Sequence, residues 1–316
     1  MLELCEAERS PSTPGSPPPP SPVSDESEAG MPSTPPPTGS ENLWIAGWSG
    51  PDDNRSLQFI VSLTQGQMGR HPLFVADLEP GALDAPSIRT AMSQVAATLA
   101  GIEPPVDGRV YAVFGPRPFA QAFSQAWCLQ VDATPSDDPN MAASYMECTR
   151  SSIREAPTPI PGHRIRRAGY DDVDAAANFC QKYSSYPYHL DLESARREAT
   201  TLIDRRALFF YEVDTGTDGY CATCMLAVGR SSANVASITK LYTLPDFRGK
   251  GFASQLLHYV CSCLLNAEGK SAVVSLVPFE NDTYKRLAMR MGFDHSPSGH
   301  EGWLELGFEN VNMGHW

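Results

Sequence analysis

The 316-residue sequence has no apolar run long enough to span a bilayer, and its first residues show no basic segment followed by an apolar one. These absences predict a soluble protein that is not secreted and lies in the cytoplasm or the nucleus. Basic residues are also scarce, since 24 Lys and Arg face 37 Asp and Glu and the net charge is −13. Because phosphate backbones and anionic lipids attract basic surfaces, we expect neither a nucleic acid nor a membrane as a partner.

Two common phosphate-binding motifs are missing as well. The sequence has no Gly-x-x-x-x-Gly-Lys-Ser/Thr, and no Gly-x-Gly-x-x-Gly follows a predicted strand. The eight cysteines are scattered, mostly inside apolar runs, as buried free thiols are in a reducing compartment. Cys221 and Cys224 form a Cys-x-x-Cys pair, but neither a second pair nor a nearby His completes a set of four ligands, so we expect no metal.

Composition divides the chain into three segments. Residues 1–42 are dominated by Pro, Ser, Glu and Gly and cannot bury enough apolar surface to offset their conformational entropy, so we expect a disordered tail. This tail is either a partner-binding or phosphorylated arm or a dispensable one. Residues 43–160 predict a smaller α/β subdomain, which ends in a Pro- and Asp-rich linker over residues 132–161 with one ordered piece at residues 141–148. Residues 161–316 predict the main domain.

The main domain has a distinct order of predicted elements. A short strand and two helices come first, and three successive strands, a helix, a strand, a helix and a last strand follow. The predicted strands are residues 164–167, 207–213, 220–228, 235–243, 272–277 and 303–308, and the predicted helices are residues 170–182, 192–202, 282–291 and one from residue 252 that ends at Gly269. The domain is therefore of the α/β (α+β) class.

The segment Arg-Gly-Lys-Gly-Phe-Ala at residues 248–253 lies between the strand 235–243 and an amphipathic helix. Glycines have no Cβ, so they let backbone N–H groups approach an anion closely, and the start of a helix adds a positive dipole. Arg248 and Lys250 add cationic side chains that form charge-assisted hydrogen bonds with phosphate. The segment therefore predicts a phosphate cradle.

The order of elements and the loop together resemble the GNAT superfamily of acyl-CoA N-acyltransferases, whose acyl-CoA loop reads Arg/Gln-x-x-Gly-x-Gly/Ala. Arg248, Gly251 and Ala253 occupy the three fixed positions of this pattern. The second motif of the family is also present, as Asn281 followed eleven residues later by Gly-Phe. The resemblance begins near residue 162, and it implies a mixed, mostly antiparallel sheet flanked by helices.

The resemblance also implies acetyl-CoA as the co-substrate and an amine of a small molecule or a peptide as the acceptor. The strand before the loop is then expected to hold the pantetheine and the thioester carbonyl, and the loop backbone the pyrophosphate. The implied cofactor-binding residues are Leu241, Tyr242, Thr243, Arg248, Gly249, Lys250, Gly251, Phe252, Ala253 and Asn281. Asn281 stands directly before a predicted helix, so it is equally well interpreted as a helix cap.

Two positions depart from the catalytic pattern of the family. A Tyr commonly stands seven residues after the Asn, as the acid for the CoA thiolate, but here this position is Ala288. An acidic residue is common on the strand before the loop, where this chain has Ser237, Thr239 and Lys240. Tyr284 lies one helical turn before Ala288 on the same face of the helix, and we predict it as the substitute acid.

The sequence offers further candidate residues for the site and an alternative function. Tyr242 is a further catalytic candidate, and Glu212, His295 and Glu301 are candidates to reach the amine. The N-terminal subdomain is expected to flank the acceptor cleft, or to be a degenerate copy of the same fold that lacks a second glycine loop. The leading hypothesis is an N-acetyltransferase; the alternative, motivated by the missing Tyr and acid, is an acyl-CoA-binding or interaction protein without turnover.

Overall fold

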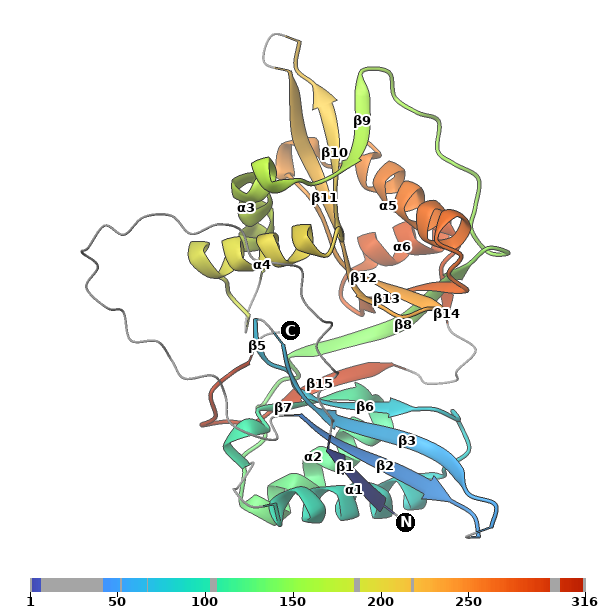
Figure 1. The fold of residues 1–316 in the computed structure, drawn as a ribbon, viewed down its shortest axis with the longest axis vertical. Coiled ribbons are helices and arrows are strands. Elements are labelled where there is room, and N and C mark those ends of the chain that lie inside the picture. The colour runs from blue at the N-terminus through green and yellow to red at the C-terminus, as the bar shows by residue number, and fades with distance from the viewer. Residues whose placement is uncertain are drawn as a thin grey trace, which may run out of the picture.

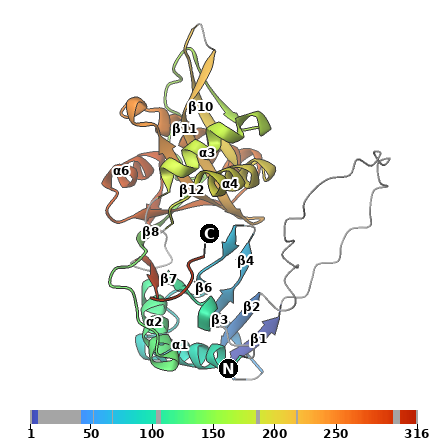
Figure 2. The ribbon, with the colours of Figure 1, turned by 90° about the vertical axis from the view of Figure 1, so that its left-hand side faces the viewer.

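The computed structural model describes residues 2–6, 42–51, 53–66, 68–102, 107–184, 188–216, 219–295 and 302–314. Within them, an N-terminal and a C-terminal half are stacked along the long axis of the molecule (Figures 1 and 2). None of the helices in these residues is both long enough and apolar enough to cross a membrane.

The N-terminal half contains most of the first 150 residues that the structure describes. Its strands are β1 (Leu2–Glu6), β2 (Leu43–Ser49), β3 (Ser56–Leu63), β4 (Gln65–Gly66), β5 (Gly69–Arg70), β6 (Leu73–Asp77), β7 (Ala112–Pro116) and β8 (Met141–Thr149). Its helices are α1 (Ala85–Ala100), the short 3-10 helix η1 (Asp107–Arg109) and α2 (Arg117–Val131). Strands and helices alternate in this half, as the predicted α/β class requires, and residues 57–63 belong to β3.

The C-terminal half follows the predicted order of elements. Its strands are β9 (His163–Arg167), β10 (Leu208–Asp214), β11 (Tyr220–Ser231), β12 (Val235–Thr243), β13 (Ala272–Pro278), β14 (Asp294–His295) and β15 (Trp303–Gly307). Its helices are η2 (Tyr170–Asp172), α3 (Val173–Tyr183), α4 (Leu192–Asp204), η3 (Pro245–Phe247), α5 (Phe252–Ser262), the π-helical turn η4 (Cys263–Ala267) and α6 (Asp282–Met291). The mixed, mostly antiparallel sheet flanked by helices is therefore confirmed.

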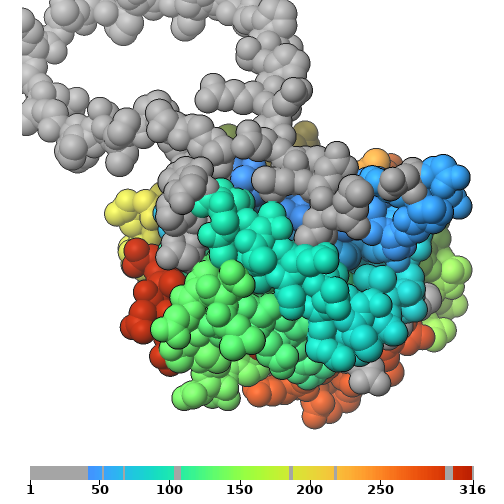
Figure 3. All heavy atoms as spheres, turned by 90° about the horizontal axis from the view of Figure 1, so that it is seen from below, coloured from blue at the N-terminus to red at the C-terminus, as the bar shows by residue number. Residues whose placement is uncertain are grey.

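Local sequence explains where the helices begin and which face they bury. The carboxylate of Asp84 caps α1 by accepting the backbone N–H of Ser87, and α1 then buries a side chain every three or four residues, at Ile88, Met92 and Val95. Together with α2 it covers one side of the N-terminal half, and in the view from below the two helices occupy the centre of this surface (Figure 3).

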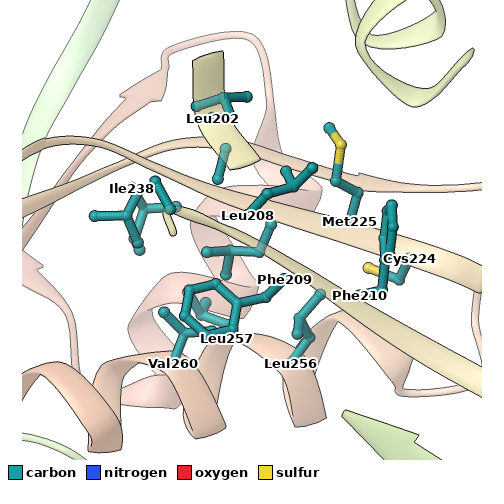
Figure 4. Close-up of a cluster of buried hydrophobic side chains, with 14 of the residues drawn as sticks. Leu202, Leu208, Phe209, Phe210, Cys224, Met225, Ile238, Leu256, Leu257 and Val260 are labelled. Carbon is teal, nitrogen blue, oxygen red and sulfur yellow. The ribbon is translucent and has the colours of Figure 1, made fainter. Parts of the chain in front are cut away.

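In the C-terminal half, helices pack on both faces of the sheet. Figure 4 shows Leu256, Leu257 and Val260 of α5 on one side of β10 to β12 and Leu202 of α4 on the other, and all four are at most 7% exposed. The burial of these apolar side chains is the main source of stability for the two layers.

The two halves exchange strands within one continuous sheet. Its order is β1-β2-β3-β6-β7-β15-β8-β13-β12-β11-β10-β9, with β14 beside β8. β15 lies between β7 and β8, and its Leu304 belongs to the core of the N-terminal half. β8 pairs with β13 along seven residues, and Met146 and Cys148 belong to the core of the C-terminal half.

This exchange corrects the predicted division at residue 160. The ordered piece at residues 141–148 is not part of a linker but a central strand, and the strand at residues 303–308 does not complete the C-terminal half. The prediction is wrong here because the Pro- and Asp-rich composition belongs to the exposed loops around residues 141–148. It gives no information about which distant strand pairs with these residues.

The prediction of a disordered tail also needs a correction. Residues 2–6 form β1, which is antiparallel to β2, whereas residues 7–41 lie outside the described residues. Leu2, Glu3 and Leu4 alternate between apolar and polar side chains, which favours a strand where a sheet edge is available. The Pro- and Ser-rich composition of the whole segment conceals this five-residue pattern.

The halves repeat one topology. The order β1, then β2-β3-β6-α1-β7-α2-β8, corresponds to β9, then β10-β11-β12-α5-β13-α6 and the last strands. In both halves the third strand of the antiparallel set is parallel to the strand after the helix, β6 to β7 and β12 to β13. Counterparts of α3 and α4 are not among the described residues of the N-terminal half, but the rest of the fold occurs twice.

Candidate functional site

The parallel strands β12 and β13 separate part-way along the sheet. Residues 235–238 pair with residues 272–275, and no later pair of these strands exists among the described residues. β12 continues to Thr243 with β11 as its partner on the other edge. Residues 239–243 therefore present one backbone edge that neither strand covers, and such an edge forms hydrogen bonds with an extended chain.

A β-bulge lies where the strands separate. Ile238 is opposite Val228 of β11, whereas Lys240 is opposite Ala227, so Thr239 is an extra residue of β12. A bulge bends its strand and redirects the side chains that follow. Lys240 consequently lies on the sheet face opposite to that of Ile238, the face on which α3 and α4 pack.

β12 ends in the predicted glycine loop, which leads directly into α5. Gly249 and Gly251 have φ angles of +76° and +83°, which residues with a side chain rarely adopt. A Cβ at either glycine would meet no described atom within 4 Å. The backbone conformation therefore requires the glycines, and the space beside them is open to a ligand.

The start of α5 offers uncapped N–H groups. Gly251 stands at the cap position, and no side chain of the described residues takes its place. The first N–H groups of a helix have no partner inside it, and they attract anions together with the helix dipole. Phe252 fixes this helix start, since it is 5% exposed and stacks on Tyr211 with ring centres 4.7 Å apart.

Two exposed cations flank the loop. Arg248 donates from Nε to the carbonyl oxygen of Thr243 at 3.1 Å, and its guanidinium lies 5.4 Å from the ring centre of Tyr242. Lys250 lies with Nζ 5.0 Å from the ring centre of Phe247. Because both heads are exposed, they can turn toward a phosphate without leaving a buried group unpaired.

Tyr284 lies at the separation of the two strands. Its hydroxyl is 2.7 Å from Oγ of Ser275, the last residue of β13 that pairs with β12, and Ser275 also donates to the carbonyl of Ile238 at 3.5 Å. Burial raises the pKa of Tyr284 well above its usual value, so the phenol keeps its proton at neutral pH. Ala288 is fully buried in the core instead.

Comparison with known proteins decides the family of the C-terminal half. Residues 173–293 match the sequence model of the acetyltransferase (GNAT) family. The chain carries a GNAT domain. This domain includes the separated strands, the glycine loop, α5 and α6. A search of curated proteins found no match to the chain.

Solved structures resemble the whole arrangement and not only the GNAT domain. A Drosophila protein is 12% identical, with a TM-score of 0.57, over 84% of this chain and 78% of its own. A GCN5-related N-acetyltransferase from Kribbella flavida is 11% identical, with a TM-score of 0.51, over 80% and 87%. A tandem GNAT protein from the clavulanic acid biosynthesis pathway is 12% identical, with a TM-score of 0.50, over 86% and 84%. At these identities the similarity concerns the fold.

Asn281 acts as a helix cap in this GNAT domain. Its Oδ1 accepts the backbone N–H of Tyr284 at 2.9 Å at the start of α6. The cap interpretation is therefore confirmed, and a role for Asn281 in cofactor binding stays a prediction. Similarly, the side chain of Phe252 belongs to the core, so only its backbone is available to a ligand.

The GNAT domain also contains a set of interacting side chains, Tyr183, Lys240 and Glu198, whose contacts were not predicted from the sequence. The hydroxyl of Tyr183, at the end of α3, donates to the carbonyl of the bulged Thr239 at 3.0 Å. The ring of Tyr183 lies 4.9 Å from Nζ of Lys240, which in turn is 2.9 Å from Glu198 of α4. The ion pair is nearly buried, with side chains 13% and 9% exposed. The three elements are far apart in the sequence, so no local pattern links these residues.

Of the residues predicted to reach the amine, Glu212 and His295 do not lie where β12 and β13 separate. Glu212 lies on β10, two strands from β12, and its buried carboxylate forms ion pairs with Arg164 and Arg166. Its prediction is wrong because two guanidinium groups already neutralise it. His295 is exposed on β14, beside β8, and Glu301 lies outside the described residues.

Proposed function

We propose that the protein is an N-acetyltransferase that transfers the acetyl group of acetyl-CoA to an amine. One observation carries this proposal: the uncovered backbone edge of residues 239–243 leads directly into the uncapped start of α5. An extended arm with amide groups matches the first feature, and a diphosphate matches the second. A pantetheine arm ending in a pyrophosphate has these two parts in this order.

The residues divide into two binding groups. Backbone groups of Leu241, Tyr242 and Thr243 would bond the pantetheine arm. The N–H groups of the loop and of the start of α5 would hold the pyrophosphate, with the side chains of Arg248 and Lys250 as additional cations. The residues of this second group are Arg248, Gly249, Lys250, Gly251, Phe252 and Ala253. Asn281, at the start of α6, would contact the pantetheine.

The reaction requires few groups from the protein. Acetyl-CoA supplies the thioester, at whose carbonyl carbon a C–N bond forms while the C–S bond breaks. Tyr284, whose hydroxyl lies where the strands separate, would donate its proton to the departing sulfur. The proton that the amine nitrogen gives up would return to the phenol oxygen, directly or through solvent, so that an amide, a thiol and a neutral phenol result. A thiol has a pKa of about 8.5, so its anion also leaves without a proton at modest cost.

The missing Tyr and the missing carboxylate favour a second function, which is acyl-CoA binding without turnover. Ala288 is buried where the family commonly has a Tyr, and β12 carries Ser237, Thr239 and Lys240 but no carboxylate. A protein that binds acyl-CoA without turnover would need the cradle but neither acid nor base.

Two measurements on the full chain separate these functions. Calorimetric titration with acetyl-CoA should show binding under both. Release of free CoA thiol, followed with a panel of primary amines, should occur only with the enzyme. Absence of binding would contradict both functions, and binding without thiol release for any amine would leave the second one.

A further inference from the structure

A cavity that the proposed acetyl transfer does not use lies in the N-terminal half, between α1 and the strands β2 and β3. It measures about 330 Å³, and α1 runs below these two strands in Figure 1. Trp48 of β2 and Phe59 of β3 contribute aromatic rings to its lining, and α1 contributes Ser87, Ala91 and Gln94 among others. A volume of this size lies at the lower end of the range for small-molecule sites, so it suits a molecule of one or two rings.

The corresponding place in the C-terminal half is filled by side chains. Both halves carry a β-bulge at this point, since Gln58 is the extra residue of β3 and Thr223 is the extra residue of the corresponding strand β11. Beside the bulge of β11, Phe252 of α5 stacks on Tyr211 of β10 with ring centres 4.7 Å apart. Both rings are at most 5% exposed, so they close the space between the start of α5 and the strands.

Smaller residues leave this space open in the N-terminal half. Gly47 of β2 stands opposite the residue that follows the bulge, the position that Tyr211 holds in β10. The ring of Phe59 lies over Gly47, 2.2 Å from where a Cβ would be, and covers part of the space. None of the described lining residues of α1 is aromatic, and Ser87 and Ala91 in its first two turns are small. The cavity is therefore the volume that the missing side chains leave.

Gln58 provides this cavity with one fixed polar group. It is 4% exposed, and its amide nitrogen donates to Oε2 of Glu79 at 3.2 Å and to the carbonyl of Ser56 at 3.5 Å. Because a carboxylate can only accept, Glu79 fixes the orientation of the amide, and the amide oxygen is left to accept a hydrogen bond. None of the described lining residues carries a charge, so a charged ligand would lose its hydration without gaining a counter-charge.

We propose that this cavity binds a neutral molecule of one or two aromatic rings, whose N–H or O–H donates to the amide oxygen of Gln58. The rings would pack against Trp48 and Phe59, in the place that side chains fill in the other half. The hydrogen bond would set the orientation of the molecule, as a small number of polar groups do in mostly apolar sites. The site is separate from the glycine loop, so it does not depend on the proposed acetyl transfer.

Indole is a suitable probe, because it is neutral, has two fused rings and donates one N–H. A titration of the full chain, followed by ligand-observed NMR, should give a dissociation constant of about 1 mM or lower, as expected for so small a molecule. Indene has the same shape without the N–H and should bind about fivefold more weakly, the size of one neutral hydrogen bond. Saturating acetyl-CoA should not displace indole.

A substitution in the lining shows whether indole binds at this place. Ala91→Phe should fill the cavity with an aromatic ring and abolish indole binding, whereas Ala97→Phe, at an exposed position of the same helix, should leave it unchanged. Circular dichroism shows whether the variants are folded, and Ala91→Leu tests the same space with a smaller side chain if Ala91→Phe does not fold.

Four results would overturn the proposal. They are no binding of indole at several millimolar, unchanged binding in the folded Ala91 variant, displacement of indole by acetyl-CoA, and equal affinities for indole and indene. The first three would remove the site itself, and the last would remove the hydrogen bond to Gln58 that defines its ligand.

Discussion

The two halves of the molecule share a topology but differ at the helix that follows their third strand. In both, the parallel strands separate early: β6 pairs with β7 over two residues and β12 with β13 over four. α1 starts with the carboxylate of Asp84 bonded to the N–H of Ser87, and Pro86 has no N–H to offer. α5 starts at Gly251 with no such cap.

This difference decides where an anion fits. The Ser87 hydroxyl and N–H lower the pKa of Asp84, so a negative charge occupies the start of α1 at neutral pH. The same end of α5 presents N–H groups, the helix dipole and two cations. The two halves therefore offer corresponding helix starts, and of these two only the start of α5 is without a side-chain cap among the described residues, as the proposed pyrophosphate site requires.

The largest expected effect comes from a negative charge in the cradle. Arg248→Glu and Gly251→Glu should each weaken acetyl-CoA binding more than about 100-fold, because a carboxylate beside a pyrophosphate replaces attraction by repulsion. Calorimetry measures the affinity, and circular dichroism shows that the variants are folded. Arg89→Glu, in the second turn of α1, should leave binding unchanged. An unchanged affinity in either folded cradle variant would refute the phosphate assignment.

Loss of the proposed acid should affect the rate and not binding. Tyr284→Phe should lower kcat about 100-fold, as general acids contribute on this order, with the acetyl-CoA dissociation constant unchanged. Because the pKa of Tyr284 is raised, the wild-type acid stays protonated as pH increases, and its contribution should be lost only above the usual range of a tyrosine. A variant with wild-type kcat would show that the thiolate leaves without this proton.

A proline in the first turn of α5 would remove one backbone N–H, as Pro86 does in α1. Ala253 is the second residue of α5, as Pro86 is of α1, and proline is tolerated in a first turn. Ala253→Pro removes one N–H from the cradle and should weaken acetyl-CoA binding about tenfold, the size of one hydrogen bond to a charged group. Pro86→Ala is the matched control and should not change the affinity. Equal affinities in both variants would mean that this N–H does not contact the phosphate.

The smallest effect concerns the cap of α1 itself. Asp84→Ala should lower the melting temperature slightly at pH 7 without changing acetyl-CoA binding. The pKa of Asp84 is lowered by folding, so its contribution to stability is present above the unfolded pKa and is lost as pH falls through the lower folded value. The difference between variant and wild type should therefore shrink below about pH 4. A difference that persists in acid would assign the effect to something other than the charged cap.

The glycine loop between β12 and α5 could be predicted from the sequence because its parts are contiguous. The strand, both glycines and the helix follow one another, and positive φ angles at Gly249 and Gly251 express a local preference. The exchange of β8 and β15 could not be predicted, since it joins residues such as Asn140 and Glu305, 165 positions apart. Sequence reasoning placed Glu212 near the amine, but its neutralising arginines lie on another strand.

The central claim is that only the C-terminal half holds acyl-CoA, at the start of α5. A crystal structure of the full chain with acetyl-CoA tests this most directly. It should show the pyrophosphate on the backbone N–H groups of residues 249–253, the pantetheine along residues 241–243, and no diphosphate at Asp84. A pyrophosphate bound at the start of α1, or away from both helix starts, would contradict the account.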